Sequence, residues 1–319
     1  MRPRAPGGGA GVKGGGAGGP APLITPAALR GPVAAMVAAT LLWGATFVVI
    51  RDSLGGLDPG SLVLLRFTGA TAVFAILLRG HPGALSRTAI AGGALSGLLM
   101  AGGYLFQAIG LTATKAGTSA FLTCTGTLFA GLFAWPLLGQ RPSRVLTAGL
   151  ALAAFGSSLM GSRPGLSVGP GEWWTLFGAL AFALQIVAVA RFAPRADPVA
   201  LAGIQSLAVA LMLSPLAGEA SRQLWALPAA GWWRLGYLVV AGSVLAPMLQ
   251  IIAQRSLPPG RVGLLFALEP VFALVFAVTV GSERFVLRWW WGAALILAAV
   301  WAVEGRAARD RASSPSASA

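Results

Sequence analysis

Apolar stretches of about twenty residues recur along almost the whole chain, and short polar breaks separate them. At about 1.5 Å per residue, a helix of this length crosses the roughly 30 Å hydrocarbon core of a bilayer. The breaks are rich in glycine, proline and charged residues, and none is long enough to hold a separate soluble domain. The pattern therefore predicts an all-α polytopic membrane protein. Its ten predicted transmembrane helices span residues 32–52, 61–78, 89–111, 117–138, 144–161, 173–191, 198–216, 231–253, 261–281 and 287–304.

The two ends of the chain lack this apolar pattern. Residues 1–30 form a tract of glycine, alanine and proline, and residues 305–319 are polar. Neither segment has enough apolar surface to offset the entropy of ordering, so both are predicted to be disordered tails. A cleaved signal peptide is the alternative for the first segment. It is disfavoured because the first apolar run begins only after Arg30 and is longer than a signal core.

Composition supports the membrane class and explains the excess of basic residues. Hydrophobic residues make up 56% of the 319 and charged residues 10%, whereas soluble domains carry about 25% charged residues. A net charge of +14 would indicate nucleic acid as a partner of a soluble protein. Here the basic residues lie mainly in the connections, where they set orientation in the bilayer. We therefore expect a lipid bilayer and no nucleic acid as partner.

An internal repeat relates the two halves of the chain. With an offset of 143 positions, residues 108–134 match residues 251–277. A shorter match at an offset of 139 positions pairs Asp58 and its following proline with Asp197 and its following proline. The repeat predicts one five-helix unit over residues 31–161 and a second over 172–304.

Five helices are an odd number, so equivalent helices of the two units are predicted to cross the membrane in opposite directions. This inverted-repeat plan is typical of secondary transporters, which bind their substrate near the midplane between the repeats. The predicted fold is thus ten transmembrane helices arranged as two inverted five-helix repeats.

Several blocks of the sequence resemble the EamA family of the drug/metabolite transporter superfamily. The blocks are LLWGATFVVIRDSL, LDPGSLVLLRF, LLGQRPSRVLTAGLALAAFGSSLM, and LEPVFALVFAVTVGSE followed by WWWGAALILAAVWAV. Their ordered occurrence covers residues 32–304. The resemblance implies a ten-helix inverted-repeat fold and the export of amino acids, related metabolites or drugs.

The first half departs from the family pattern in its fourth helix. Thr127 stands at the position that matches Pro270, and Gly126 at the position that matches Glu269. The proline that is frequent in the family is therefore missing from this half. This difference predicts that the two halves contribute unequally to gating.

Glu269 is the strongest candidate for a functional residue. It lies inside the apolar run 262–280 and is followed by Pro270, which removes a backbone donor and predicts a break in the helix. An acid inside a bilayer costs at least about 2.5 kcal/mol on insertion scales and usually faces a cavity. Two roles stay open for Glu269. It is either a substrate-amine counterion or proton carrier, or a structural acid that bonds to a neighbouring helix.

Five further residues are candidates for a substrate site. Arg66 has two possible functional roles, which are to bind a substrate carboxylate or to close an outer gate. The structural alternatives are that its side chain snorkels to the membrane surface or pairs with another helix. Trp43 lies near the middle of the first helix, where it either walls a cavity or packs in the core. Gln107 and Gln250 are repeat mates, and Tyr104 adds a hydroxyl. For these three, hydrogen bonding between helices is the alternative role.

The sequence disfavours an enzyme and a primary pump. His81 is the one histidine, and there is no HExxH motif, no paired carboxylates and no GxxxxGK[ST] loop. Cys124 is the one cysteine, so we expect neither a disulfide framework nor a metal or other cofactor.

The most favoured function is a secondary active transporter. It would export small metabolites, amino acids or drugs across the cytoplasmic membrane by alternating access, with protons as a candidate coupling ion. The alternatives are a channel, a scaffold or an importer of the same fold. The substrate and the oligomeric state, including a homodimer, stay open.

The positive-inside rule predicts that both termini are cytoplasmic. This orientation puts fifteen basic residues on the inner side and seven on the outer side. Reporter fusions should detect cytoplasm after Arg87, Arg144, Arg195 and Arg261, and the opposite side after Gly56 and Arg222. A consistent inversion of these signals, or a mixture of both orientations, would contradict the prediction.

Overall fold

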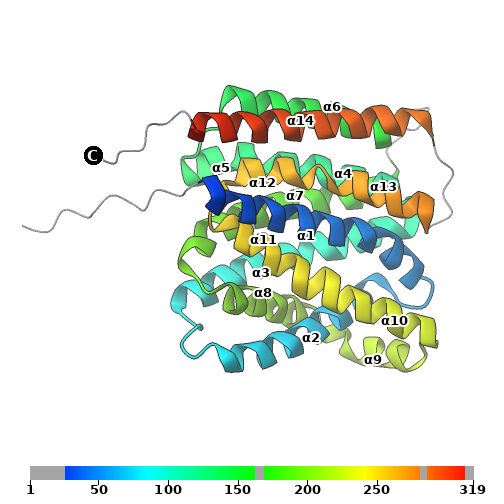
Figure 1. The fold of residues 1–319 in the computed structure, drawn as a ribbon. Helices are drawn as coiled ribbons and strands as arrows, with labels where there is room; N and C mark the ends of the chain where they lie inside the picture. Colours follow the sequence, from blue (N-terminus) through cyan, green and yellow to red (C-terminus); the bar gives the residue numbers. More distant parts are fainter. Residues whose placement is uncertain (1–25, 162–168, 281–285, 313–319) are drawn as a thin grey trace, which may run out of the picture.

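The computed structural model describes residues 26–161, 169–280 and 286–312, and within these ranges it contains helices and no strands. The helices lie side by side with roughly parallel axes and form a single bundle (Figure 1). The first helix, α1 (Pro26–Ser53), begins at the end of the bundle where the last, α14 (Leu287–Ala312), finishes (Figure 1). An even number of crossings accounts for this placement of the two termini.

Each predicted apolar run corresponds to one helix or to a set of consecutive helices. Five runs besides the first are single helices, namely α2 (Pro59–Leu77), α3 (Arg87–Ala113), α6 (Arg144–Gly161), α7 (Pro170–Phe192) and α14. Three runs are divided: α4 (Ala116–Leu128) with α5 (Ala130–Leu138), α10 (Ala229–Tyr237) with η4 (Leu238–Leu245) and α11 (Ala246–Gln254), and α12 (Pro259–Phe266) with α13 (Glu269–Thr279). The run 198–216 corresponds to α8 (Pro198–Leu213) with the 3-10 turn Ser214–Leu216, and α9 (Ala217–Trp225) follows it outside the predicted runs. Over the described residues, nine helical segments are long and apolar enough to span a membrane, and α6 contributes a shorter apolar helix. The polytopic, all-helical architecture is as predicted.

The predicted limits of the two tails need correction. Helix α14 continues to Ala312, so the prediction of disorder was wrong for residues 305–312. Alanine, glutamate and arginine favour helix, and the Arg306 Nε lies 3.0 Å from the Asp310 Oδ1 one turn later. Helix α1 begins at Pro26, inside the predicted first tail. The remaining tail residues, 1–25 and 313–319, lie outside the described residues.

Equivalent Asp-Pro pairs start equivalent helices in the two halves. The Asp58 Oδ1 accepts a hydrogen bond from the Ser61 N–H at 2.9 Å at the start of α2. The Asp197 Oδ1 accepts from the N–H groups of Val199 and Ala200 at the start of α8. In both helices the proline occupies the first position, where no N–H is required. The repeat detected in the sequence therefore marks equivalent N-caps.

Helix α3 packs closely against α7 and α8, and glycines make this contact possible. A Cβ at Gly97 would lie 2.7 Å from both the Ala208 Cβ and the Gln205 carbonyl oxygen of α8. At Gly103 it would lie 2.5 Å from the Phe182 ring of α7. The small residues of segment 91–103 thus allow the close packing of α3 on its neighbours.

The main helix interfaces occur in equivalent pairs across the repeat. Helix α3 packs on α7, and the equivalent interface of the other half is α11 on α1. Likewise α4 packs on α7, and its equivalent is α13 on α1. Two interfaces join a helix to its own repeat mate, α2 with α8 and α6 with α14. Helices α6 and α14 lie at one edge of the bundle, with α2 and α9 at the opposite edge (Figure 1).

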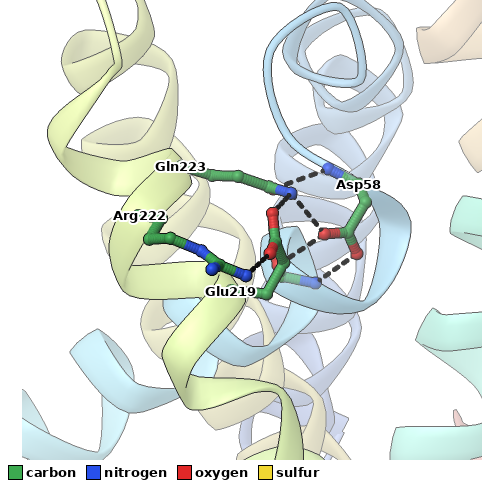
Figure 2. A network of polar contacts seen from close by, with 5 residues as sticks. Asp58, Glu219, Arg222 and Gln223 are labelled. Carbon is green, nitrogen blue, oxygen red and sulfur yellow. Dashed lines mark hydrogen bonds and ion pairs between the residues drawn. The ribbon is translucent and has the colours of Figure 1, made fainter.

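Helix α9 has no counterpart in the first half, where a short 3-10 turn, Leu78–Gly80, follows α2. Figure 2 shows how polar side chains tie α9 to the start of α2. The Gln223 Nε2 donates to the Asp58 Oδ2 and to the Glu219 Oε1, both at 2.7 Å, and the Gln223 Oε1 accepts from the Asp58 N–H at 2.9 Å. Arg222 pairs with Glu219 on the exposed side. Partial burial acts to raise the pKa of Asp58, but hydrogen bonds from Ser61 and Gln223 outweigh it and lower the pKa below its ordinary value.

We predict that Asp58→Ala destabilises the protein more than Asp197→Ala does. Each change removes an N-cap, at a cost of about 1 kcal/mol, but only the first also removes the contact with Gln223. The midpoint of unfolding in detergent measures both variants. The pKa of Asp58 is lower in the folded protein than in the unfolded chain. The stability that the ionised Asp58 carboxylate contributes should therefore be fully present above the unfolded pKa, and it should be lost as the pH falls through the folded pKa. Equal losses in the two variants would show that the Gln223 contact adds no stability.

Candidate functional site

A small cavity, about 30 Å³ in volume, lies between the two halves of the bundle. Each half contributes six side chains, and Glu269 is the one charged residue in the lining. The lining residues are Trp43 and Thr46 of α1, Met100, Tyr104 and Gln107 of α3, Thr123 of α4, Phe182, Gln185 and Ile186 of α7, Gln250 of α11, Phe266 of α12, and Glu269 of α13. The cavity thus combines an aromatic and aliphatic wall with amides, hydroxyls and one carboxylate.

The structure brings most of the predicted site residues together. Five of the six line this cavity, namely Trp43, Tyr104, Gln107, Gln250 and Glu269. The sixth, Arg66, lies outside the lining, behind the ring of Tyr104.

Glu269 lies at a break in its transmembrane segment. Helix α12 ends at Phe266 and α13 begins at Glu269. The N–H groups of Ala267 and Leu268 bond to carbonyls three residues earlier, at 3.0 and 3.1 Å, which tightens the turn, and Pro270 has no N–H to donate. Regular helix is therefore interrupted directly before Pro270.

The Glu269 carboxylate is buried but has no partner in the protein. The residue is only 5% exposed. Among the described residues, no side chain or backbone N–H lies within hydrogen-bond or ion-pair distance of its carboxylate. Its position at the start of α13 favours negative charge, because the first N–H groups of a helix carry a partial positive charge. The interpretation of Glu269 as an acid bonded to a neighbouring helix therefore lacks support in the structure.

The first half contains an equivalent break without a proline. Helices α4 and α5 are separated at Phe129, whose N–H bonds to the Gly126 carbonyl oxygen at 3.0 Å. No side chain fits at Gly126, because a Cβ there would lie 2.6 Å from the carbonyl carbon of Ala179 in α7. The missing proline therefore does not leave this helix continuous. The halves differ instead in chemistry, since only the second half places an acid at its break.

Trp43 lines the cavity and also compensates an irregular helix. Its ring stacks on Phe266 with centroids 5.3 Å apart and planes 17° apart. Its indole Nε1 donates to the Gly242 carbonyl oxygen at 3.0 Å. Gly242 lies in the π-helical segment η4, where the Ala246 N–H bonds instead to the Ala241 carbonyl, and Pro247 has no N–H. The Trp43 indole therefore donates the hydrogen bond that the Gly242 carbonyl does not receive from a backbone N–H.

Arg66 does not snorkel, because it is only 1% exposed. Its Nε donates to the Ser243 Oγ of η4 at 2.8 Å, which joins α2 to this segment. The guanidinium carbon lies 4.5 Å from the centroid of the Tyr104 ring and 5.4 Å from that of Phe67. The Arg66 Nη2 is buried and has no hydrogen-bond partner among the described residues. Tyr104 thus contacts Arg66 with its ring and lines the cavity together with Glu269.

The glutamines of the cavity bond to one another and to hydroxyls. The Gln107 Nε2 donates to the Thr123 Oγ1 at 3.1 Å. The Gln250 Nε2 donates to the Oε1 atoms of Gln185 and Gln254, at 3.1 and 2.8 Å. These amides therefore link helices as well as line the cavity.

Seven residues of the lining were not predicted from the sequence. The missed residues are Thr46, Met100, Thr123, Phe182, Gln185, Ile186 and Phe266. An amide inside an apolar run marks Gln185, and proximity to the Glu269 break marks Phe266. The other five carry no signal that distinguishes them from ordinary core residues.

Comparison with known proteins assigns both halves to one family. Residues 30–162 and 169–304 each match the EamA-like transporter family, so the domain is present twice and the predicted resemblance is confirmed. An uncharacterized transporter of Archaeoglobus fulgidus is 29% identical over 82% of this chain and 81% of its own length. The uncharacterized inner membrane transporter YedA of Escherichia coli K12 is 27% identical over 83% of this chain and 88% of its own. These names indicate a multi-pass membrane transporter and not an enzyme.

A solved crystal structure supports the fold. It superimposes with a TM-score of 0.69 at 21% identity and covers 86% of this chain and 98% of its own. At this level of identity the match concerns the fold alone.

We predict that Trp43→Phe destabilises the protein by roughly 1–3 kcal/mol, because it leaves the buried Gly242 carbonyl without a donor. Trp174→Phe is the matched control. Trp174 stacks on Phe106 with centroids 5.4 Å apart, is 40% exposed and donates no hydrogen bond within the described structure. Unfolding midpoints in detergent should therefore fall for Trp43→Phe and stay nearly unchanged for Trp174→Phe. Equal effects would mean that lost ring area, and not the hydrogen bond, determines the cost.

Proposed function

The chain belongs to the EamA-like transporter family, and on this basis we propose that it is a secondary active transporter of the cytoplasmic membrane. It exports small metabolites, amino acids or drugs by alternating access. The observation that carries this proposal is the buried Glu269 carboxylate, which has no partner among the described residues and faces a cavity between the two halves. A structural acid would be neutralised by a neighbour, whereas a binding or coupling acid has to be free for its ligand.

The helix packing supports an arrangement as two inverted five-helix repeats. Each half supplies six of the lining residues, and the main interfaces have equivalents in the other half. Alternating access in such transporters moves one repeat against the other around a fixed central site. The cavity has the position that this mechanism requires.

The interrupted helices give each half a place to bend. Breaks at Phe129 in the first half and at Ala267 in the second lie beside the cavity helices, where the backbone departs from regular α-helix. Local loss of regular hydrogen bonding lowers the resistance to bending at these points. Together they offer a pair of hinges close to the substrate.

The proposed direction is export, with both termini cytoplasmic and protons as the coupling ion. Glu269 is the group that would carry the proton, and Tyr104 is an ionisable group that lines the same cavity. A channel, an importer or a scaffold would use the same fold differently. Counterflow of labelled solute in proteoliposomes separates a carrier from a channel or scaffold, because exchange requires alternating access.

We predict that Glu269→Gln inserts and folds but loses most of its transport. The amide is nearly isosteric and removes a charge that is expensive in a bilayer. Comparison of all solutes in the medium of cells with no transporter, the wild type and the variant measures export, and it does not require that the substrate be identified first. Asp310→Asn, near the exposed end of α14, is the control and should export normally. Undiminished export by a folded Glu269→Gln protein would leave no role for the carboxylate in transport.

If Glu269 carries the proton, any residual export by the variant should also lose its dependence on external pH. If it only binds a substrate amine, apparent affinity should fall while a pH dependence through other groups persists. Measurement of the rate against pH and substrate concentration distinguishes the two roles.

A further inference from the structure

We propose that the cavity selects organic cations with a flat apolar body over amino acids and anions. The ammonium group binds to Glu269, and the body packs among the aromatic side chains of the lining. The inference rests on the proposed function, since it takes this cavity as the substrate site.

Charge in the cavity favours a cation. Glu269 is the one charged lining residue, and no cation of the protein pairs with it in the described part of the chain. A buried carboxylate that lacks a partner is costly, because it has lost its hydration without compensation. A bound ammonium group supplies the positive charge and the N–H donors that the Glu269 carboxylate lacks. A neutral ligand would leave the carboxylate uncompensated, and an anion would face like charge.

Arg66 is placed so that its guanidinium cannot bind a substrate carboxylate in the cavity directly. Its guanidinium lies outside the lining and against the face of the Tyr104 ring, 4.5 Å from the centroid. Its Nε is held by Ser243, and its Nη2 is buried away from the cavity surface. A zwitterionic amino acid would therefore bring a carboxylate that meets no cationic side chain.

Aromatic rings form much of the remaining wall. Trp43, Tyr104, Phe182 and Phe266 line the cavity from four different helices. Phe182 meets Tyr104 edge-on with centroids 5.0 Å apart, and Phe266 stacks on Trp43. Ring faces attract cations, with a gain of about 0.5–2 kcal/mol each, and they pack well against flat apolar groups. The same wall thus suits both parts of the proposed ligand.

Three probes with the same phenyl body test the inference: 2-phenylethylamine is a cation, phenylalanine a zwitterion and 3-phenylpropionate an anion. Binding to the purified full-length protein in detergent is measured by calorimetry at pH 7. We expect 2-phenylethylamine to bind at least tenfold more tightly than phenylalanine, and 3-phenylpropionate not to bind. Glu269→Gln should weaken the binding of 2-phenylethylamine at least tenfold. Glu269→Asp, which keeps the charge, should preserve the order of the three probes.

Three results would overturn the proposal: equal or tighter binding of phenylalanine or 3-phenylpropionate, unchanged binding of 2-phenylethylamine to a folded Glu269→Gln protein, or no binding of 2-phenylethylamine to the wild type. Counterflow of the labelled probes in proteoliposomes tests the proposed function separately. Exchange of phenylalanine without exchange of 2-phenylethylamine would refute the substrate class and leave transport intact. Binding of 2-phenylethylamine through Glu269 without any exchange would refute transport and leave the binding preference intact.

Discussion

In the hydrocarbon core of a bilayer no water is present to bond a free carbonyl or N–H, so each departure from regular helix has to be compensated within the protein. The cavity of this protein is built around such departures. At Gly242 the indole of Trp43 replaces the missing backbone donor, and at Glu269 a tight turn bridges α12 and α13. The backbone can therefore be irregular beside the cavity without leaving these groups unpaired.

Two buried charged residues differ in how far the protein compensates them. The Arg66 guanidinium bonds to Ser243 and packs on the Tyr104 ring, although its Nη2 has no hydrogen-bond partner among the described residues. Glu269 has no such partner among the described residues and opens onto the cavity. Tyr104 contacts both environments, because it lines the cavity with Glu269 and its ring packs against Arg66.

Hydrophobic runs, the repeat and the Glu269-Pro270 pair were enough to predict the helices, the helix break and five of the cavity residues. The helical end of α14 was missed because its alanines and charges resemble a disordered tail in composition. Helix α9 was missed because it is short and amphipathic. Phe182 could not be identified, since hydrophobicity predicts burial in an apolar environment but does not tell a cavity from a lipid contact. The π-helix has no sequence periodicity of its own, so the role of Gly242 required the structure.

Helix α9 introduces an asymmetry into an otherwise balanced pair of repeats. Two inverted halves with identical contacts would give the inward-facing and outward-facing states the same free energy. The hydrogen bonds that Gln223 makes with Asp58 have no equivalent at the 3-10 turn after α2, so one end of the bundle is held more firmly than the other. If the proposed alternating access holds, these bonds would bias the resting population toward the state that keeps them, even without substrate or an ion gradient.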